Sequence, residues 1–415
     1  MKEKIFRYID GCEALAVELE TELTRRPAVS PQSGGEGELE KALFLETWLK
    51  QKGVTHLERY DAPDPKAKGG VRPNLTATVP GAADNTRLWI MSHLDVVPPG
   101  ELSQWASDPW TVVRKDRRII GRGVEDNQQG LTSSVLAALS LIHQGITPPH
   151  TVKLLFAADE ETGSDYGVGW LLKQPGVFRK DDAALIPDSG DPLGETIEIA
   201  EKNLLWMKFT TTGVQTHGSR PCQGVNAHLA GAALALALHH GLSEKFPARD
   251  ALFEAPGYST FEPTKQEANV PNINTIPGED VFCMDMRILP RYPLKDALAE
   301  IDRITADVAA KYGVAVKSEV VQSAQSKTTP DDAPVVALLA RAIREVYGTE
   351  PRTVGIGGGT MAAPLRNGGI DAAVWCRLQD QAHQPNEYAV IDHILGDAKV
   401  MALLMLSDRE HYKAR

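Results

Sequence analysis

The chain has 415 residues, of which 42% are hydrophobic and 24% charged, and its formal net charge is −11. This composition is typical of a soluble globular protein of two or three domains. The excess of acidic residues argues against a nucleic-acid partner and against binding to an anionic membrane surface.

The four cysteines, Cys12, Cys222, Cys283 and Cys376, are far apart and form no C-x-x-C pair. A disulfide framework or a cysteine zinc site is therefore not expected, and free thiols are typical of a reducing compartment. The N-terminal residues show no apolar signal sequence. No stretch approaches the ~18 uninterrupted apolar residues of a membrane span. We therefore expect a cytoplasmic protein.

The first half of the sequence alternates helical and extended patterns. Helices are predicted over residues 39–52 and 130–143. The predicted strands are dense apolar runs, at 74–79, 87–93, 151–158 and 183–187. Apolar strands that alternate with helices are typical of a mostly parallel sheet covered by helices on both faces.

The pattern changes near residue 199. Residues 197–212 alternate polar and apolar side chains, as in an antiparallel strand with one exposed face. Four further elements complete this region: helices at 227–242 and 294–312, and strands at 281–289 and 314–321. Together they predict a small α+β unit.

The α/β pattern returns after about residue 323. Its predicted elements are a helix at 334–347, a glycine loop at 355–359, a strand at 371–376 and a final helix from about 391. Insertion of one domain into another explains this order. We predict an α/β catalytic domain made of residues 1–198 and 323–415, and an inserted α+β domain made of residues 199–322.

Histidine and acidic side chains follow several predicted strands, at the edge where open parallel sheets form ligand clefts. His93 and Asp95 end one strand, and a carboxylate beside an imidazole can fix its tautomer. A structural hydrogen bond is the simpler interpretation of this pair alone. Asp126 follows a glycine-rich turn, where Asp126 or Asn127 could instead cap the next helix.

Two more strand ends and one loop carry candidate groups. Asp159, Glu160 and Glu161 directly follow a buried strand, and three adjacent carboxylates there are costly unless a cation or proton compensates them. Asp188 ends another strand, and His383 opens a loop before the last helix. Taken singly, these groups could be a solvated acidic turn, an ordinary turn and a surface histidine.

Considered together, these segments offer two histidines and at least three carboxylates, a ligand set that zinc accepts. Two metal ions bridged by a carboxylate can polarise a carbonyl group and lower the pKa of a water molecule. A further carboxylate must then accept the proton of that water. The adjacent Glu160 and Glu161 could supply one base and one ligand.

The order of these motifs resembles that of the co-catalytic zinc amidohydrolases and peptidases, from about Leu19 to Asp408. That family includes succinyl-diaminopimelate desuccinylase, acetylornithine deacetylase, aminoacylase and carboxypeptidase G. The shared motifs are His93-x-Asp95, the turn at 121–126, Asp159-Glu160-Glu161, Asp188, His217, Gly357-Gly358-Gly359-Thr360 and His383.

The resemblance implies two divalent metal ions per subunit, with zinc expected and cobalt or manganese as alternatives. Asp126 would bridge the two ions. His93 and Asp188 would complete one site, and Glu161 and His383 the other.

The resemblance also assigns the catalytic groups. Glu160 matches the general base, and Asp95 matches the carboxylate that orients His93. A cis peptide bond is implied between Asp126 and Asn127.

The inserted domain resembles the lid or dimerisation domain of the family, which implies a homodimer. His217 would reach the active site of the partner subunit and stabilise the tetrahedral oxyanion, where a suitable donor can be worth ~10²–10³ in rate.

Substrate contacts are expected from the inserted domain and the glycine loop. Arg287 could bind a substrate carboxylate, or could instead form a salt bridge with Asp285. Asn274 matches an asparagine that the family keeps near the substrate or oxyanion. The backbone N–H groups around Gly358, Gly359 and Thr360 suit a carboxylate.

Other classes of protein fit less well. The glycine loop lacks the sixth glycine and the strand–helix context of a dinucleotide fingerprint, and no G-x-S-x-G of a serine hydrolase occurs. A non-catalytic scaffold that binds metal or peptide would be expected to lack the base or a ligand, and all six positions are present.

We therefore predict a two-metal hydrolase that cleaves the amide bond of an N-acyl amino acid, with a succinyl or acetyl group and a free carboxylate. A metallo-dipeptidase or carboxypeptidase acting on a short peptide is the alternative. No nucleic-acid or membrane partner is expected.

Overall fold

The computed structural model describes residues 1–408, and the chain divides into two compact units. The first unit contains Met1–Ile199, Thr329–Thr353 and the chain from Thr360 onwards. The second unit contains Ala200–Thr328 and the short segment Val354–Gly359. The second unit is thus an insertion within the first.

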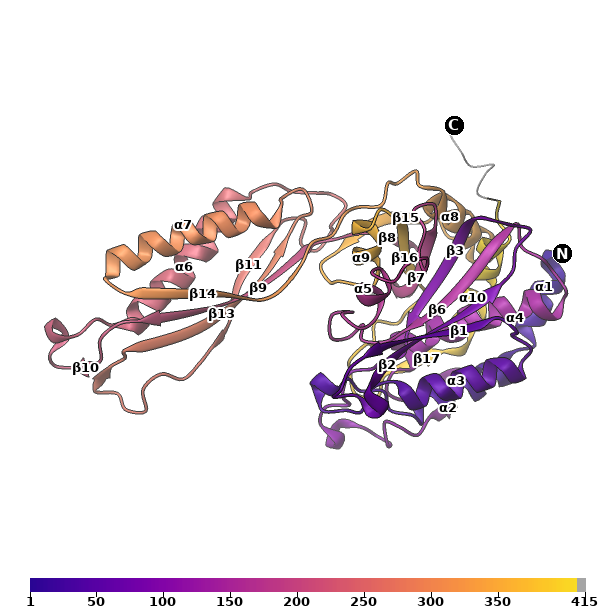
Figure 1. Ribbon diagram of the computed structural model, residues 1–415, viewed down its shortest axis with the longest axis horizontal. Helices are drawn as coiled ribbons and strands as arrows, with labels where there is room; N and C mark the ends of the chain where they lie inside the picture. Colours follow the sequence, from indigo (N-terminus) through magenta and orange to yellow (C-terminus); the bar gives the residue numbers. More distant parts are fainter. Residues whose placement is uncertain (409–415) are drawn as a thin grey trace. The chain divides into compact units, whose positions relative to one another are not determined.

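An eight-stranded sheet runs through the first unit in the order β1-β2-β6-β3-β7-β16-β8-β15 (Figure 1). Strands β6, β3, β7 and β16 are parallel, whereas β1, β2 and β8 pair in antiparallel fashion. The predicted parallel sheet is therefore confirmed at its centre. The strands are β1 (Leu57–Pro63), β2 (Val71–Val79), β3 (Ala83–His93), β6 (His150–Ala157), β7 (Ala183–Gly190), β8 (Thr196–Glu201), β15 (Arg352–Ile356) and β16 (Asp371–Cys376).

Helices cover both faces of this sheet. Helix α4 (Gly130–His143) contacts β3, β6 and β7, and α8 (Pro334–Tyr347) contacts β7 and β16; α10 (Ile391–Met405) packs against both helices. On the other face, alternate side chains such as Trp89 and Met91 pack against α5 (Val168–Leu171) and α9 (Ala362–Asn367). Because strand side chains alternate between faces, the continuous apolar run of β3 fills both layers.

Further elements surround the sheet of the first unit. The N-terminal helices are α1 (Lys2–Asp10), α2 (Glu13–Thr24) and α3 (Leu39–Gln51). A small three-stranded sheet has the order β17-β5-β4, and its strands are β4 (Val113–Lys115), β5 (Arg118–Ile120) and β17 (Tyr388–Val390). Among the residues described, no helix is long and apolar enough to span a bilayer.

A buried ion pair anchors the middle of β3, the strand that ends at His93. Arg87 Nη2 lies 2.6 Å from Asp182 Oδ2, and both side chains are almost fully buried. The indole N–H of Trp89 donates to the same carboxylate at 2.8 Å. With several donors on one carboxylate, the charge is compensated, as a buried ion requires.

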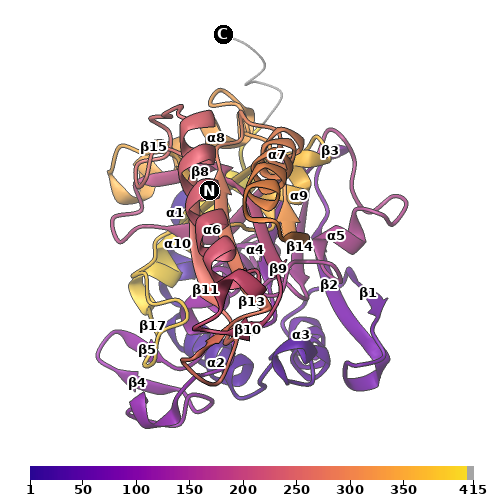
Figure 2. The same cartoon turned by 90° about the vertical axis from the view of Figure 1, so that its left-hand side faces the viewer.

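The second unit is an antiparallel sheet in the order β11-β13-β9-β14 with two helices on one face. The strands are β9 (Asn203–Thr212), β11 (Thr260–Gln266), β13 (Glu279–Ile288) and β14 (Ala315–Ala324). Helices α6 (Ala227–Lys245) and α7 (Leu294–Tyr312) lie side by side on this sheet (Figure 2). A short pairing of β10 (Thr216–His217) with β12 (Thr275–Ile276) lies beyond them.

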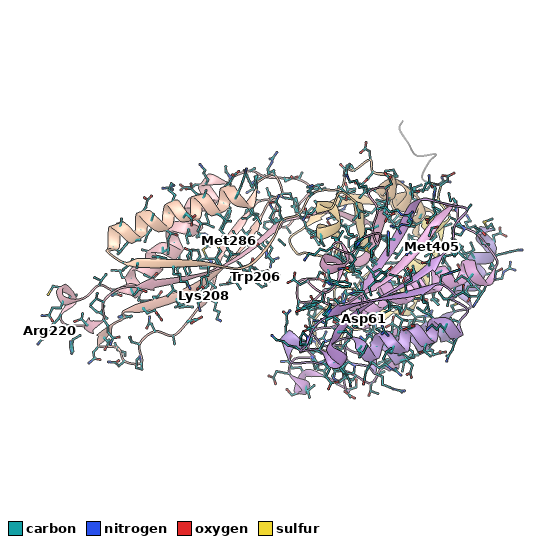
Figure 3. All side chains as sticks on the ribbon, viewed as in Figure 1. Asp61, Trp206, Lys208, Arg220, Met286 and Met405 are labelled. Carbon is teal, nitrogen blue, oxygen red and sulfur yellow. The ribbon has the colours of Figure 1, made fainter. Side chains whose placement is uncertain are left out.

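The two faces of this second sheet differ in polarity. Met286, like its neighbours on that face, is buried in the apolar core beneath α6 and α7. Trp206 and Lys208 point to the opposite side of the sheet (Figure 3). The alternation predicted for residues 197–212 is therefore confirmed, but two strands share it. Strand β8 belongs to the large sheet, and only β9 belongs to the second unit.

Candidate active site

Two groups of side chains meet at the edge of the large sheet where β3, β6 and β7 end. One group is His93, Asp126 and Asp188, and the other is Asp126, Glu161 and His383. Within each group the possible ligand atoms all lie within 4.8 Å of one another. The structure thus brings together five residues that are spread over nearly 300 positions of the sequence.

Asp126 belongs to both groups and directs a different oxygen toward each. Its Oδ1 lies 3.0 Å from His93 Nε2, and its Oδ2 lies 3.2 Å from His383 Nε2. His93 Nε2 is also 3.4 Å from Asp188 Oδ1, and His383 Nε2 is 3.1 Å from Glu161 Oε2. One carboxylate is therefore shared by two sets of donors, which is the arrangement of a bridging ligand.

The turn that carries Asp126 is irregular. Gly123 has φ 84°, and a Cβ atom there would lie 2.5 Å from a side-chain atom of Val96, so only glycine fits. The peptide bond between Asp126 and Asn127 is cis, as the family resemblance implies. Neither side chain caps α4, whose N-cap is Gln129 with no side-chain hydrogen bond.

Asp95 connects the histidine to the acidic turn after β6. His93 Nδ1 lies 2.9 Å from the main-chain oxygen of Asp95 and 3.5 Å from its Oδ1. The Asp95 carboxylate accepts the main-chain N–H groups of Glu160 and Glu161, each at 3.0 Å. Asp95 therefore fixes both the imidazole and the turn that presents the two glutamates.

Glu387 anchors the turn that carries Asp126. This fully buried carboxylate accepts the main-chain N–H groups of Gly123, Glu125 and Asp126 at 2.9–3.0 Å. It also pairs with Arg122 at 2.6 Å. Arg122 Nη2 in turn donates to the main-chain oxygen of His383 at 3.3 Å, so this pair joins the two segments that supply ligands.

Two neighbouring side chains complete this support. Glu125 accepts the main-chain N–H groups of Gln379 and Gln381, which precede His383. Asn127 Nδ2 donates to Asp188 Oδ1 at 2.6 Å, and Asn127 Oδ1 accepts the main-chain N–H of His93 at 3.3 Å.

A positioning function of Glu387, Glu125 and Asn127 is not predicted from the sequence. The only signal available was their closeness to predicted ligands, because hydrogen bonds to main-chain groups leave no spacing pattern.

The pKa shifts reflect a concentration of negative charge. Burial would lower the pKa of His93, but the charge of Asp188 and the hydrogen bond with Asp126 raise it well above its usual range. Hydrogen bonds with Asp126 and Glu161 raise the pKa of His383 to about 10. Charge that retains protons on two histidines also favours divalent cations, whose binding would displace those protons.

The donor set fits metal ions. Each group offers one imidazole nitrogen and carboxylate oxygens, which are ligands of zinc and of related divalent cations. Glu161 Oε1 is buried and has no hydrogen-bond partner among the described residues. A buried carboxylate oxygen without a donor is costly, and coordination of a cation would satisfy it.

Glu160 lies next to this cluster but belongs to neither group of ligands. Burial, followed by the negative charge of Asp188, raises the pKa of Glu160 well above its usual range. Its main-chain N–H is held by Asp95, and no hydrogen bond of its carboxylate appears among the described residues. The carboxylate is therefore available to bind a proton beside the proposed ligands.

The second unit holds the other predicted residues except Thr360, which belongs to the first unit. His217 and Asn274 lie close together, because the N–H of Gly218 donates to Asn274 O at 2.7 Å. His217 Nδ1 lies 2.8 Å from Ser219 Oγ. The other ring nitrogen, Nε2, does not take part in this contact.

Arg287 forms the salt bridge that was the alternative interpretation. Its Nε and Nη2 donate to Asp285 at 2.6 and 2.9 Å, and its Nη1 donates to Gly357 O at 3.0 Å. The glycine loop next to this contact is open, since a Cβ at Gly357 or Gly358 would meet no atom within 4 Å. Thr360 Oγ1 accepts the N–H of Ala362 at the start of α9.

Comparison with known proteins identifies the family. Residues 89–407 match peptidase family M20/M25/M40. An uncharacterised metallohydrolase of Methanocaldococcus jannaschii is 38% identical over 404 residues, which cover 93% of this chain and 97% of that protein. A succinyl-diaminopimelate desuccinylase of Cereibacter sphaeroides is 28% identical over 356 residues, covering 84% and 87% of the two chains.

A solved structure shares the fold. A dipeptidase of Saccharomyces cerevisiae superposes with a TM-score of 0.77 at 16% identity, covering 100% of this chain and 99% of that chain. The chain belongs to peptidase family M20/M25/M40 and is a metal-dependent hydrolase of amide or peptide bonds. The predicted family and fold class are thus confirmed.

Replacement of Glu387 tests the support of the ligand turn. Glu387→Gln should weaken metal binding by about 10- to 100-fold. The amide has only one oxygen, and its NH₂ group cannot accept hydrogen bonds from the main-chain N–H groups that the carboxylate binds. Metal affinity is measured by competition with a chromogenic chelator. Glu350→Gln, an exposed glutamate paired with Arg344, is the control and should bind metal normally. Unchanged affinity in Glu387→Gln would refute this function of Glu387.

Proposed function

We propose that this member of peptidase family M20/M25/M40 hydrolyses the amide bond of an N-acyl amino acid that carries a succinyl or acetyl group and a free carboxylate. The observation that carries the proposal is the placement of Asp126 between two sets of donors, with the carboxylate of Glu160 beside them. A sequence identity of 28% to a desuccinylase over most of both chains supports the choice of a succinyl group.

The proposed ligands divide into a shared residue and two pairs. Asp126 would contact both metal ions, His93 and Asp188 one of them, and Glu161 and His383 the other. Zinc is the proposed metal because the ligands are imidazole nitrogens and carboxylate oxygens. Cobalt and manganese are alternatives, because divalent first-row metals compete for the same nitrogen and oxygen sites.

When bound, two such metal ions supply Lewis acidity, which polarises a substrate carbonyl and lowers the pKa of a water molecule. Glu160 takes a proton from the attacking water and later gives it to the leaving amine. Asp95 holds the main-chain N–H of Glu160 and thereby limits the positions that its carboxylate can reach. Burial favours protonation of Glu160, which suits the second of these steps.

Recognition of the substrate carboxylate is proposed for Arg287, Asn274 and the loop at Gly358, Gly359 and Thr360. The guanidinium of Arg287 is already bound by Asp285 in bidentate fashion. A substrate carboxylate would therefore either replace Asp285 or use Nη1, which faces Gly357 O. Arginine is well suited to such an exchange, since its planar fork binds any carboxylate in the same geometry.

We also propose that the enzyme is a homodimer in which His217 of each subunit acts at the active site of the other. The second unit exposes apolar side chains that a partner could cover. Leu229 and Leu236 on α6 are 56% and 59% exposed, and Val321 on the edge strand β14 is 61% exposed. An open edge strand is a ready site for pairing with another chain.

A cytoplasmic location is proposed from the cysteines. All four are free thiols in the structure, as is usual in a reducing compartment.

The substrate proposal is tested with metal-stripped protein reloaded with zinc, cobalt or manganese. The panel contains N-succinyl, N-acetyl and N-formyl amino acids and a matched set of dipeptides, and amine release is measured. We expect metal-dependent hydrolysis of N-succinyl or N-acetyl substrates. Faster hydrolysis of dipeptides would instead favour the dipeptidase or carboxypeptidase alternative, and no turnover despite bound metal would contradict both.

The proposed base is tested by Glu160→Gln, which keeps the size of the side chain but cannot accept the proton. The turnover number should fall by at least ~10²–10⁴-fold, while the metal content measured by emission spectroscopy stays normal. Glu101→Gln, at an exposed glutamate, serves as the control and should retain full activity. A near-normal rate in Glu160→Gln would exclude this residue as the base.

The shared active site is tested with heterodimers of His217→Ala and Glu160→Gln subunits, purified through two different tags. Each homodimer should be nearly inactive. In the heterodimer, one site combines an intact Glu160 with His217 of the other subunit, so about half of the wild-type rate is expected from the symmetry of the dimer. If verified heterodimers stay inactive, His217 does not act across subunits.

A further inference from the structure

The loop at residues 158–166 follows β6 and carries the proposed general base. A side chain of the neighbouring strand β2 holds both ends of this loop. Asn74 Oδ1 accepts the main-chain N–H of Ala158 at 3.1 Å, and Asn74 Nδ2 donates to the main-chain oxygen of Tyr166 at 2.9 Å. One amide group therefore bridges the two ends of the loop.

A second side chain of β2 binds the loop through a charge. Arg72 lies two residues before Asn74, on the same face of the strand, and is fully buried. Its Nε and Nη2 donate to the two carboxylate oxygens of Glu38 at 2.7 and 2.5 Å. Its Nη2 also lies 3.3 Å from Asp159 Oδ1. One guanidinium group thus joins the residue before α3 to the first acidic residue of the loop.

Asp159 belongs to neither group of proposed metal ligands, and its carboxylate is bound within the loop instead. This fully buried carboxylate accepts the hydroxyl of Thr162 and, at 3.0 Å, the main-chain N–H of Tyr166. The main-chain N–H of Asp159 donates to Glu38 Oε1 at 3.3 Å. Its φ is 65°, in the left-handed region that residues other than glycine seldom adopt. These contacts therefore hold the chain in a turn that it would not favour alone.

The turn at Asp159 determines the direction of the chain at Glu160. Two further main-chain hydrogen bonds close the loop, from Ser164 N–H to Asp159 O at 2.6 Å and from Gly163 N–H to Glu160 O at 3.1 Å. Asp95 binds the main-chain N–H of Glu160 at 3.0 Å. The main chain of the proposed base is therefore restrained both by Asp95 and by the contacts of Asp159.

We propose that Arg72 and Asp159 are positioning residues that set, through this loop, the direction in which Glu160 presents its carboxylate. The inference rests on the proposed function, in which Glu160 is the general base. Arginine suits this task because its planar guanidinium binds carboxylates in a fixed geometry, whereas the ammonium group of lysine does not. A displacement of about 1 Å at a catalytic group can cost ~10²-fold in rate, so a small relaxation of the loop should lower kcat.

The variant Asp159→Asn tests this inference. The amide keeps the size of the side chain but has one acceptor oxygen, whereas Arg72, Thr162 and the N–H of Tyr166 all face the carboxylate. Asparagine tolerates the left-handed φ, so the change acts on the side-chain contacts. The values of kcat, KM, metal content and Tm are measured on metal-loaded protein, with the panel substrate that the wild type hydrolyses fastest.

The matched control is Asp182→Asn, which also alters a buried carboxylate paired with an arginine. Asp182 accepts hydrogen bonds from Arg87 and from the main-chain N–H of Arg179. It precedes β7, at the opposite end of that strand from Asp188. Both variants weaken a buried ion pair, so both should have a lower Tm.

We expect kcat of Asp159→Asn to fall by about 10- to 100-fold, with KM and metal content close to those of the wild type. The kcat of Asp182→Asn should be unchanged, because its ion pair does not touch the loop. If the two variants have the same kcat, Asp159 has only a structural function and the inference is overturned.

A milder pair of variants decides the matter if Asp159→Asn does not fold. Thr162→Val removes the hydroxyl that donates to Asp159 and keeps the size of the side chain, whereas Thr162→Ser keeps the hydroxyl. We expect a reduced kcat in Thr162→Val and most of the wild-type kcat in Thr162→Ser. Equal values in the two variants would contradict the inference.

Measurement of Glu160→Gln in the same assay separates this inference from the proposed function. An active Glu160→Gln would refute the assignment of the base, and the inference with it. An inactive Glu160→Gln beside a fully active Asp159→Asn would refute the positioning function alone.

Discussion

The placement of one carboxylate between two histidines governs the organisation of the active site. Asp126 directs Oδ1 to His93 and Oδ2 to His383, and Asp188 and Glu161 add further negative charge around the same point. Without compensation, the negative charges of these carboxylates would repel one another in a partly buried environment. Protons or cations must balance it, which makes metal binding and protonation competing states of the same residues.

Three buried carboxylates restrain the main chain of the segments that carry the proposed ligands. Asp95 holds the N–H groups of Glu160 and Glu161. Glu387 does the same for the turn at Asp126, and Glu125 for the loop before His383. A buried carboxylate that accepts several N–H groups is held in place by these charge-assisted hydrogen bonds, and it holds the donating main chain in place as well. The acidic groups of this protein therefore serve two purposes, as proposed ligands and as restraints on the segments that carry them.

The sequence predicted the central strands, the main helices and the insertion because each has a strong periodic or apolar pattern. It also predicted the residues that meet at the sheet edge, because the ends of parallel strands lie together. It did not separate β8 from β9 within residues 197–212, because one alternating pattern covers both strands although they pair in different sheets. It could not reveal Glu387 or Asn127, whose partners are main-chain atoms far away in the sequence. The salt bridge between Arg287 and Asp285 was predicted only as an alternative. Residues two apart on a strand lie on the same face, so the spacing allows this salt bridge but does not show that it forms.

The insertion also affects the order in which the two units can form as the chain is synthesised. The second unit has its own apolar core of residues between Leu205 and Val308 and needs only the short segment 354–359 from elsewhere. The first unit needs β16 beside β7 and α10 beside α4, and these pairs join segments about two hundred residues or more apart. Contacts between such distant segments form slowly. The interior of the gene therefore encodes the part that can become compact first, while the catalytic scaffold must wait for the last helix of the chain.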